Sequence, residues 1–404
     1  GNNADGPIAG SEKLNLGCAG GAGVTEAGTG NPGFLYGGGG SGGYYGGTNV
    51  AGGSGADGIV IISYGEAPST LSCPEIINVA STGTFQMAHS LITDGTYIYA
   101  GERINNGTPT EIARIIKYNA STLAEVSSYS VGANRDVESM VYNSGNNTIY
   151  ASQTYDNGVS TVVSIMRINP SNMALIDTTI YNGLITGEGF PLVTDGNYIY
   201  GGTYRDPATF FKIRLSDMAL VATNEWTSGE RAHAARIDVE NGYMYVTDIP
   251  YSAGTDVRFA KVSLSDLSYS EVNIGAYVRK ATDDFAMVKS GGETYCYVGS
   301  EYVYSSGGNA GYGGVQIRTS DMSLTGISLK TTYALGESGN IVYSTTIDGN
   351  IEVFDISDLN SVLTCTLSGY YGNEFISLGI YGYITNFNAY NESDGKLIRI
   401  SLTE

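Results

Sequence analysis

Two histidines are the side chains in this sequence best suited to acid–base chemistry, and they occur in similar phrases. One phrase is Ala88-His89-Ser90 and the other is Ala232-His233-Ala234. A histidine beside a glutamate or aspartate can act as general acid and base, as a polysaccharide lyase or glycosidase would require. No Ser-x-Asp-x-Gly-x-Thr-Trp box occurs, and no Gly-x-Ser-x-Gly motif occurs outside the glycine-rich residues 1–64. The simpler interpretation is two polar lining residues, so we assign no catalytic residue.

A larger group of residues is suited to recognition. Segments rich in tyrosine, asparagine, serine and glycine, such as residues 203–207 and 300–309, interrupt the regular parts of the chain. This composition is typical of recognition loops, and planar tyrosine with arginine and aspartate also suits sugar binding. The alternative is ordinary solvated loops. The candidate ligand-binding residues are Arg103, Arg135, Asp136, Tyr155, Tyr204, Arg205, Asp206, Arg231, His233, Tyr251, Tyr302 and Tyr304.

The cysteines do not form a metal-binding pattern. Cys18, Cys73, Cys296 and Cys365 include no Cys-x-x-Cys pair, so no metal site and no zinc are expected. We expect buried free thiols, with one disulfide as the alternative. Calcium on aspartate and backbone oxygens is the one cofactor left open, although no EF-hand-like spacing supports it.

These residues lie between the units of a repeat that begins after residue 83. Seven times, a turn is followed by a short apolar strand that usually ends in tyrosine, as in Asp94-Gly95-Thr96-Tyr97-Ile98-Tyr99. The steps between the last residues are 51, 50, 45, 52, 46 and 41, with Ile384 taken as the last of the seventh unit. Repeats of roughly 40–50 residues with several short strands are the signature of β-propellers. The sequence therefore predicts an all-β, seven-bladed propeller over residues 75–404.

A second phrase accompanies the first in each unit. It is an alternating strand, a polar turn and then Met or Leu, as in Ile213-Arg214-Leu215-Ser216-Asp217-Met218. Serine and aspartate can set a tight turn, and the Met or Leu is expected to begin the outer strand and pack between blades. The phrase resembles that of YVTN-like and quinoprotein-like propellers, from about residue 75 to the end. The resemblance implies blades of four strands, A to D, and almost nothing about function.

The propeller interpretation makes two further predictions. The last unit lacks a D strand, which residues 75–80 should supply, closing the ring and removing exposed edges. The recurring tyrosine should pack between blades with its hydroxyl on a neighbouring backbone, instead of stacking on a ligand.

The same interpretation gathers the candidate residues on one face. D-to-A and B-to-C loops share the face around the channel mouth, and function tends to lie on such loops. His89 and His233 begin the A strands of blades one and four, so they could face the channel from nearly opposite sides.

Residues 1–64 have a different composition, with 22 of the 57 glycines. Such a segment cannot bury an ordinary core and could be a flexible linker or a packed polyproline-II domain. Its end, Gly58-Ile59-Val60-Ile61-Ile62-Ser63-Tyr64, is a strong β-strand, which favours an ordered domain. The segment resembles the glycine-rich domains of phage tail fibres and bacterial surface proteins, which implies a fibre or cell-surface setting. Residues 65–74 are predicted to be a connector.

The charge and composition of the chain limit the classes of partner and the cellular location that we expect. The formal net charge of −20 disfavours nucleic acid and anionic membranes. No run of 18 apolar residues predicts a transmembrane helix, and no signal peptide is visible. The start, Gly1-Asn2-Asn3, suggests a fragment or processed product. Few charges and many tyrosines suit an extracellular β-rich protein.

Three functions remain for such a chain. The first is a non-catalytic surface or fibre-borne adhesion protein whose loop face binds a glycan or protein. The second is an extracellular carbohydrate-active enzyme that uses His89 or His233. The third is a structural subunit of a filament or coat. Self-assembly through the glycine-rich domain is a further expectation.

Overall fold

The structure is a computed structural model that describes the propeller part of the chain. It covers residues 71–402 apart from 82–86, 104–111, 134–135, 157, 188–189, 251–255, 280, 282–283, 301–312, 331, 347, 358, 360–361, 368–371 and 387–395. The chain divides into two units, Gly1–Glu66 and Ala67–Glu404. The predicted polyproline-II packing and terminal strand of residues 1–64, the start of the connector, and Cys18 lie outside the described residues. Within the described residues no helix could span a membrane.

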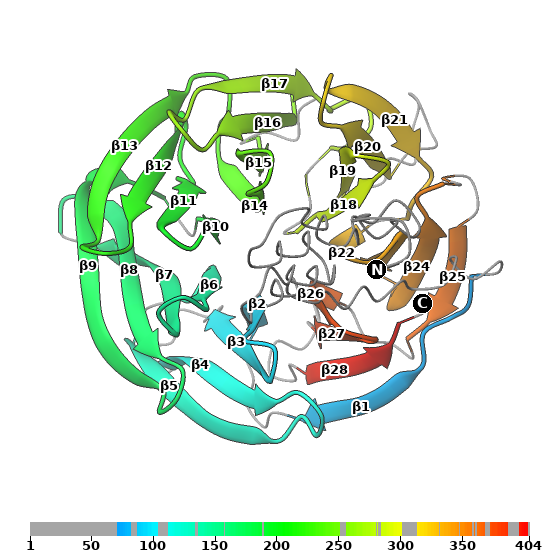
Figure 1. Cartoon of the computed structure of the whole chain (residues 1–404), viewed down its shortest axis with the longest axis horizontal. Helices are drawn as coiled ribbons and strands as arrows, with labels where there is room; N and C mark the ends of the chain where they lie inside the picture. The colour runs from blue at the N-terminus through cyan, green and yellow to red at the C-terminus, as the bar shows by residue number, and fades with distance from the viewer. Residues whose placement is uncertain are drawn as a thin grey trace, which may run out of the picture. The chain divides into compact units, whose positions relative to one another are not determined.

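The described residues form seven antiparallel four-stranded sheets arranged as blades around a ring (Figure 1), which confirms the predicted fold class. Strands A to D of blade 1 are β2 (Met87–Thr93), β3 (Tyr97–Arg103), β4 (Ile112–Asn119) and β5 (Glu125–Ala133). Those of blade 2 are β6 (Met140–Asn143), β7 (Thr148–Asp156), β8 (Thr161–Asn169) and β9 (Ala174–Ile185). Those of blade 3 are β10 (Leu192–Thr194), β11 (Tyr198–Gly202), β12 (Ala208–Arg214) and β13 (Ala219–Trp226).

The remaining blades follow the same order. Blade 4 contains β14 (Ala232–Asp238), β15 (Tyr243–Asp248), β16 (Arg258–Ser263) and β17 (Tyr269–Asn273). Blade 5 contains β18 (Ala286–Ser290), β19 (Glu293–Gly299), β20 (Gly314–Arg318) and β21 (Ser323–Ile327). Blade 6 contains β22 (Thr332–Ser338), β23 (Ile341–Thr346), β24 (Asn350–Asp355) and β25 (Val362–Thr366). Blade 7 contains β26 (Gly372–Leu378), β27 (Tyr381–Asn386), β28 (Lys396–Ser401) and β1 (Ile76–Ser81).

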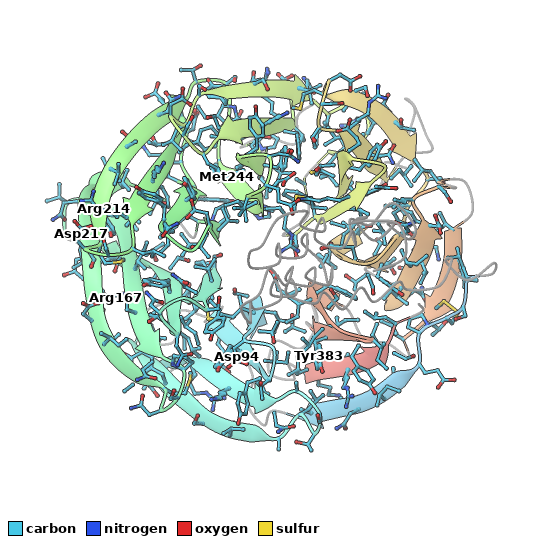
Figure 2. The ribbon with its side chains drawn as sticks, viewed as in Figure 1. Asp94, Arg167, Arg214, Asp217, Met244 and Tyr383 are labelled. Atoms are coloured by element: carbon cyan, nitrogen blue, oxygen red, sulfur yellow. A yellow bond between two sulfur atoms is a disulfide. The ribbon has the colours of Figure 1, made fainter. Side chains whose placement is uncertain are left out.

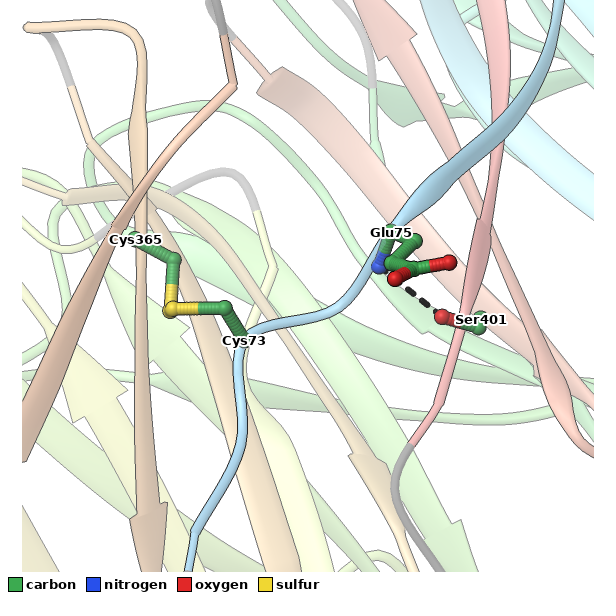
Figure 3. Close-up of a disulfide and its surroundings, with 4 residues drawn as sticks. All are labelled: Cys73, Glu75, Cys365 and Ser401. Carbon is green, nitrogen blue, oxygen red and sulfur yellow. Dashed lines mark hydrogen bonds between the residues drawn. A yellow bond between two sulfur atoms is a disulfide. The ribbon is translucent and has the colours of Figure 1, made fainter.

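The first and last described strands share blade 7, as predicted. Strand β1 pairs antiparallel with β28, with Val79 opposite Ile398. Glu75 extends the pairing, because its N–H donates to Ser401 Oγ at 2.8 Å and its carbonyl accepts from Ser401 N–H at 2.9 Å (Figure 3). The ring therefore closes by pairing residues from opposite ends of the propeller sequence.

A disulfide bond next to this closure corrects the expectation of free thiols. Cys73 is bonded to Cys365 of β25, although the two are 292 residues apart in sequence (Figure 3). Spacing could not reveal the pair, because ring closure alone brings their Cα atoms to 5.5 Å. Cys296 is the free cysteine of the described residues, and it is buried.

The repeated tyrosine is part of the core in every blade. Tyr99, Tyr150, Tyr200, Tyr245, Tyr297, Tyr343 and Tyr383 are among the largest fully buried side chains. In the seventh unit the equivalent residue is Tyr383, and not Ile384, which the repeat pattern predicted. The register shows this, since Tyr383 lies opposite Arg399 as Tyr99 lies opposite Lys117.

The partners of the tyrosine hydroxyls differ between blades. Tyr383 donates to Ala120 O of blade 1 at 2.9 Å, which matches the predicted bond to a neighbouring backbone. That prediction is wrong for Tyr99, which donates at 2.7 Å to Asp94 in the turn of its own hairpin (Asp94 is labelled in Figure 2). Asp94 is fixed there because its other oxygen accepts from the N–H groups of Thr96 and Tyr97.

Cationic side chains on the C strands join neighbouring blades at the C–D turns. Lys117 Nζ donates to Pro170 O of blade 2 at 2.7 Å and lies 3.8 Å from the centre of the Tyr97 ring. Lys212, Lys261 and Arg399 donate in the same way to Leu264 O, Thr319 O and Ser121 O of the next blade. In blade 2 the equivalent Arg167 instead pairs with Asp177 of its own D strand. Four of the seven blade contacts thus share one bond type, which the sequence repeat did not indicate.

The Met or Leu of the second phrase ends the C–D turn and precedes the outer strand, so the prediction that it begins that strand is wrong. Its backbone is left-handed, with φ of 56° at Leu123, 55° at Met173, 56° at Met218, 61° at Leu267 and 59° at Met322. Bulky side chains seldom adopt this conformation. The first four are buried, so burial of the side chain outweighs the backbone cost.

Candidate functional site

The face formed by the B–C and D–A loops is organised by a buried polar residue in the second half of the B strand, or directly after it, in each of blades 1–6. These residues lie three positions after the core tyrosine and are Glu102, Gln153, Thr203, Asp248, Ser300 and Thr346. The Glu102 carboxylate accepts from Arg114 N–H at 2.9 Å, and the Asp248 carboxylate accepts from Arg258 N–H at 2.5 Å. Each bond joins the two ends of a B–C loop. The interval of three from tyrosine was present in the sequence but was not used to find them.

Three predicted site residues meet on this face between blades 3 and 4. Tyr204 belongs to the B–C loop of blade 3, whereas Arg231 and His233 lie at the start of blade 4. Arg231 Nη1 is 3.3 Å from Tyr204 Oη, and the guanidinium carbon is 5.0 Å from the centre of the Tyr204 ring. The Tyr204 and His233 ring centres are 6.2 Å apart. We call Tyr204, Arg231 and His233 the blade 3–4 cluster.

Backbone hydrogen bonds hold the tyrosine of the cluster on both sides. Tyr204 O accepts from Gly187 N–H at 2.8 Å, and Tyr204 N–H donates to Thr186 Oγ1 at 3.2 Å. A Cβ on Gly187 would lie 2.9 Å from Tyr204 O, so only glycine allows this approach. Thr186 and Gly187 were missed as supporting residues, because their role depends on contact between loops of different blades.

The arginine of the cluster is also fixed through its main chain. Arg231 O accepts from Ile249 N–H of the next B–C loop at 3.0 Å. Ala232 N–H donates to Thr203 O at 3.2 Å, which links blade 4 to the residue before Tyr204. The cluster therefore rests on three loops of the rigid ring.

His233 occupies a β-bulge at the inner edge of blade 4. Ala232 lies opposite Asp248 and Ala234 lies opposite Thr247, so the register with β15 shifts by one residue at His233. A bulge turns a side chain away from the regular sheet direction. His89 has the same position in blade 1, between the residues opposite Glu102 and Gly101. The placement of both histidines at the starts of A strands is confirmed, although nothing is described of the His89 side chain.

Each of these bulges faces a buried carboxyl group. Burial raises the pKa of Asp248 to about 7, although the N–H groups of Arg258 and Glu230 lower it. Burial also raises the pKa of Glu102, opposed by its hydrogen bonds with Arg114. Arg114 Nη2 is 3.1 Å from Glu102 Oε1. Asp248 and Glu102 each accept a hydrogen bond from the backbone across a B–C loop, as Thr203 does. This structural role explains why buried carboxyl groups occur at these positions.

The other described candidates lie apart from the cluster or at its rim. Arg205 and Asp206 are exposed at the tip of the loop that carries Tyr204. Asp136 and Tyr155 are half-buried in the D–A segment before blade 2 and at the end of β7. Arg135, Tyr251, Tyr302, Tyr304 and the side chain of Arg103 lie outside the described residues.

No metal centre is found among the described residues, where no three His, Cys, Asp or Glu side chains gather as ligands would. The expectation that calcium could bind remains untested.

Comparison with known proteins supports the fold alone. No family model matches the sequence, and no curated protein matches it. The WD40 domain of Neurospora crassa Pan2 is similar in structure, with 7% identity, a TM-score of 0.59 and coverage of 82% of this chain and 96% of that chain. U3-55K is similar with 10% identity, a TM-score of 0.59 and coverage of 82% of this chain and all of that chain. The chain therefore has a WD40-like propeller fold, and the YVTN-like kind in particular is not distinguished.

Proposed function

We propose that this protein is a non-catalytic, extracellular or fibre-borne binding protein whose loop face recognises a glycan or a surface protein. The blade 3–4 cluster carries the proposal. An aromatic ring, a guanidinium group and an imidazole, supported by three loops of a rigid scaffold, form a preorganised recognition site. Tyrosine and arginine are the side chains that most often dominate binding energy at such sites.

Separate observations support the extracellular or fibre-borne location. The Cys73–Cys365 disulfide fits an oxidising compartment, because cytosolic proteins rarely keep such bonds. The charge of −20 and the fibre-like glycine-rich segment agree with a surface protein. Propellers commonly mediate interactions, although the fold does not specify a ligand.

The test is binding of the full chain to a glycan array and to surface-protein extracts, compared with Tyr204→Ala and Arg231→Ala. We expect each variant to lose at least about tenfold in affinity, because removal of a central anchor typically costs more than about 1–2 kcal/mol. The fluorescence of Trp226, the single tryptophan, supplies a second measurement of binding. Its ring packs against Gly229, and Gly229 lies two residues before Arg231 in the sequence.

Arg214→Ala is the matched control. Arg214 is the last residue of β12 and pairs with Asp217 in the C–D turn that follows (Figure 2). Tyr204 precedes β12, so the control residue and the cluster lie at opposite ends of this strand. Binding that is weakened by Arg214→Ala but not by the two cluster variants would contradict the proposal. Appearance of new reducing or unsaturated ends in the glycan would show catalysis instead.

A further inference from the structure

A short connection between two outer and inner strands brings Arg231 into the blade 3–4 cluster. Strand β13 of blade 3 ends at Trp226, and β14 of blade 4 begins at Ala232. Residues 227–231 join them and are here called the 227–231 loop. Arg231 is the last residue of this loop, so its approach to Tyr204 depends on how the loop is held.

The 227–231 loop lies against the indole ring of Trp226. A Cβ on Gly229 would lie 2.1 Å from the ring, so only glycine allows the chain to pass at this point. The indole is fully buried and stacks on Phe210, with ring centres 5.2 Å apart. Gly229 N–H donates to Trp226 O at 3.1 Å, and Gly229 O accepts from Ala208 N–H at 3.0 Å. The orientation of the indole therefore sets the path of the loop two residues before Arg231.

Both the indole and the loop are held by Glu271 of β17, although β13 and β17 are the outer strands of different, neighbouring blades (Figure 1). Trp226 Nε1 donates to Glu271 Oε2 at 2.7 Å, and Ser228 Oγ donates to the same oxygen. The other oxygen, Glu271 Oε1, accepts from Arg258 Nη1 at 2.8 Å. Three donors, from blade 3, the loop and blade 4, therefore converge on one carboxylate.

The three contacts of Glu271 require a carboxylate. An ionised carboxylate has two acceptor oxygens and no donor, so it can accept from all three groups at once. A glutamine keeps the size of the side chain but has one acceptor oxygen and places an NH₂ group against at least one donor. The Glu271 side chain is only 23% exposed, so water can replace a lost bond only in part. Glu271→Gln therefore removes the bonds while keeping the packing.

Arg258 extends this network to the other end of the loop. Its side chain binds Glu271, and its N–H donates to Asp248 Oδ1 at 2.5 Å. Asp248 Oδ2 is 3.4 Å from the N–H of Glu230, which it accepts as a second donor. The 227–231 loop is therefore held near both ends by carboxylates, and Arg258 joins the two.

We propose that Glu271 is a positioning residue for the blade 3–4 cluster, which fixes the 227–231 loop so that Arg231 reaches Tyr204 before any ligand is bound. The effect on binding rests on the proposed function of that cluster. Glu271 is not a member of the cluster and acts through the loop. Its loss lowers the fraction of molecules in which the cluster is assembled, and the apparent affinity falls in the same proportion.

Hydrogen exchange of the ligand-free full chain tests the positioning directly, because it measures local opening. In Glu271→Gln the amides of Gly229 and Glu230 should exchange at least about tenfold faster than in the wild type. Ser228→Ala, which removes one of the three bonds, should give a smaller change in the same direction and serves as the test if Glu271→Gln does not fold.

Asp177→Asn is the matched control. Asp177 also lies on an outer strand and pairs with an arginine of the neighbouring C strand, Arg167, but in blade 2. The same change from carboxyl to amide should leave exchange in the 227–231 loop as it is in the wild type. A general loss of stability would speed exchange alike in both variants.

Titration on the same glycan array gives the second measurement, at a temperature where every variant is folded. We expect the apparent dissociation constant to rise about three- to tenfold in Glu271→Gln and to stay unchanged in Asp177→Asn. A residue that only stabilises the fold would lower the unfolding temperature without changing the affinity of the folded chain.

Two results would overturn the proposal. One is wild-type exchange in the 227–231 loop of Glu271→Gln, and the other is a loosened loop that binds with wild-type affinity. A wild-type chain that binds neither the glycans nor the surface-protein extracts would defeat the proposed function instead. Exchange of the loop then decides alone whether Glu271 positions Arg231, with faster exchange in Glu271→Gln supporting it and equal exchange refuting it.

Discussion

Cys365 in the outer strand of blade 6 is bonded to Cys73, which lies three residues before the outer strand of blade 7 begins. Strand β1 is held to β28 by backbone pairing and to blade 6 by this covalent bond. The closing strand therefore has two independent attachments, on two neighbouring blades.

Cys365→Ser should lower the free energy of unfolding by about 2–5 kcal/mol, because the disulfide restricts a long loop of the unfolded chain. The measurement is urea denaturation followed by Trp226 fluorescence. Reductant should reproduce the loss in the wild type and add nothing in the variant. Equal stability of oxidised wild type and Cys365→Ser would contradict the idea that the bond secures closure.

Asp248 should make stability depend on pH. Its carboxyl ionises near 3.8 in the unfolded chain and near 7 in the fold, so the folded state binds more protons between these values. The free energy of unfolding should therefore fall as pH rises from about 4 to about 7, by up to about 4 kcal/mol. Asp248→Asn cannot titrate and should lack this part of the decline. Parallel stability–pH curves for the two proteins would show that the pKa is not raised.

Lys117→Met should cost about 1–3 kcal/mol, because Pro170 O loses its donor and the ammonium–Tyr97 contact disappears. The matched control is Arg167→Met at the same position of blade 2. It breaks a partly exposed ion pair within one blade and should cost less than about 1 kcal/mol. A cost for Arg167→Met equal to that for Lys117→Met, measured by urea denaturation, would argue against a special role for bonds between blades.

Substitutions at Leu267 should follow an unusual order of stability, with glycine at least as stable as alanine. Leu267→Ala removes a buried side chain and keeps a non-glycine residue at φ 61°, at a cost of about 2–5 kcal/mol. Leu267→Gly removes the same side chain but relieves about 1–2 kcal/mol of left-handed strain, so it should be at least as stable as Leu267→Ala. Val262, buried in β16, is the control, where glycine should be worse than alanine. Thermal unfolding of the four variants decides the order.

Much of the architecture could be read from the local phrases. Asp94 and Tyr99 occur together because the carboxylate of the turn accepts a hydrogen bond from the tyrosine hydroxyl of the same hairpin. Interactions between residues so close in sequence produce a pattern that recurs along the chain. The phrases therefore predicted the blade number, the strand order and the origin of the strand that completes blade 7. They failed at Ile384, where sequence similarity alone placed the repeat one residue late.

What the sequence determined by itself is the blade, because the hairpins and turns of a blade depend on neighbouring residues. What only the tertiary structure decided is which blades and loops meet. The pairing of Cys73 with Cys365, the bond from Lys117 to Pro170 and the approach of Arg231 to Tyr204 all join residues of different blades or the two ends of the ring. These distances are set by closing seven sheets into a ring, and no local pattern in the chain contains that information.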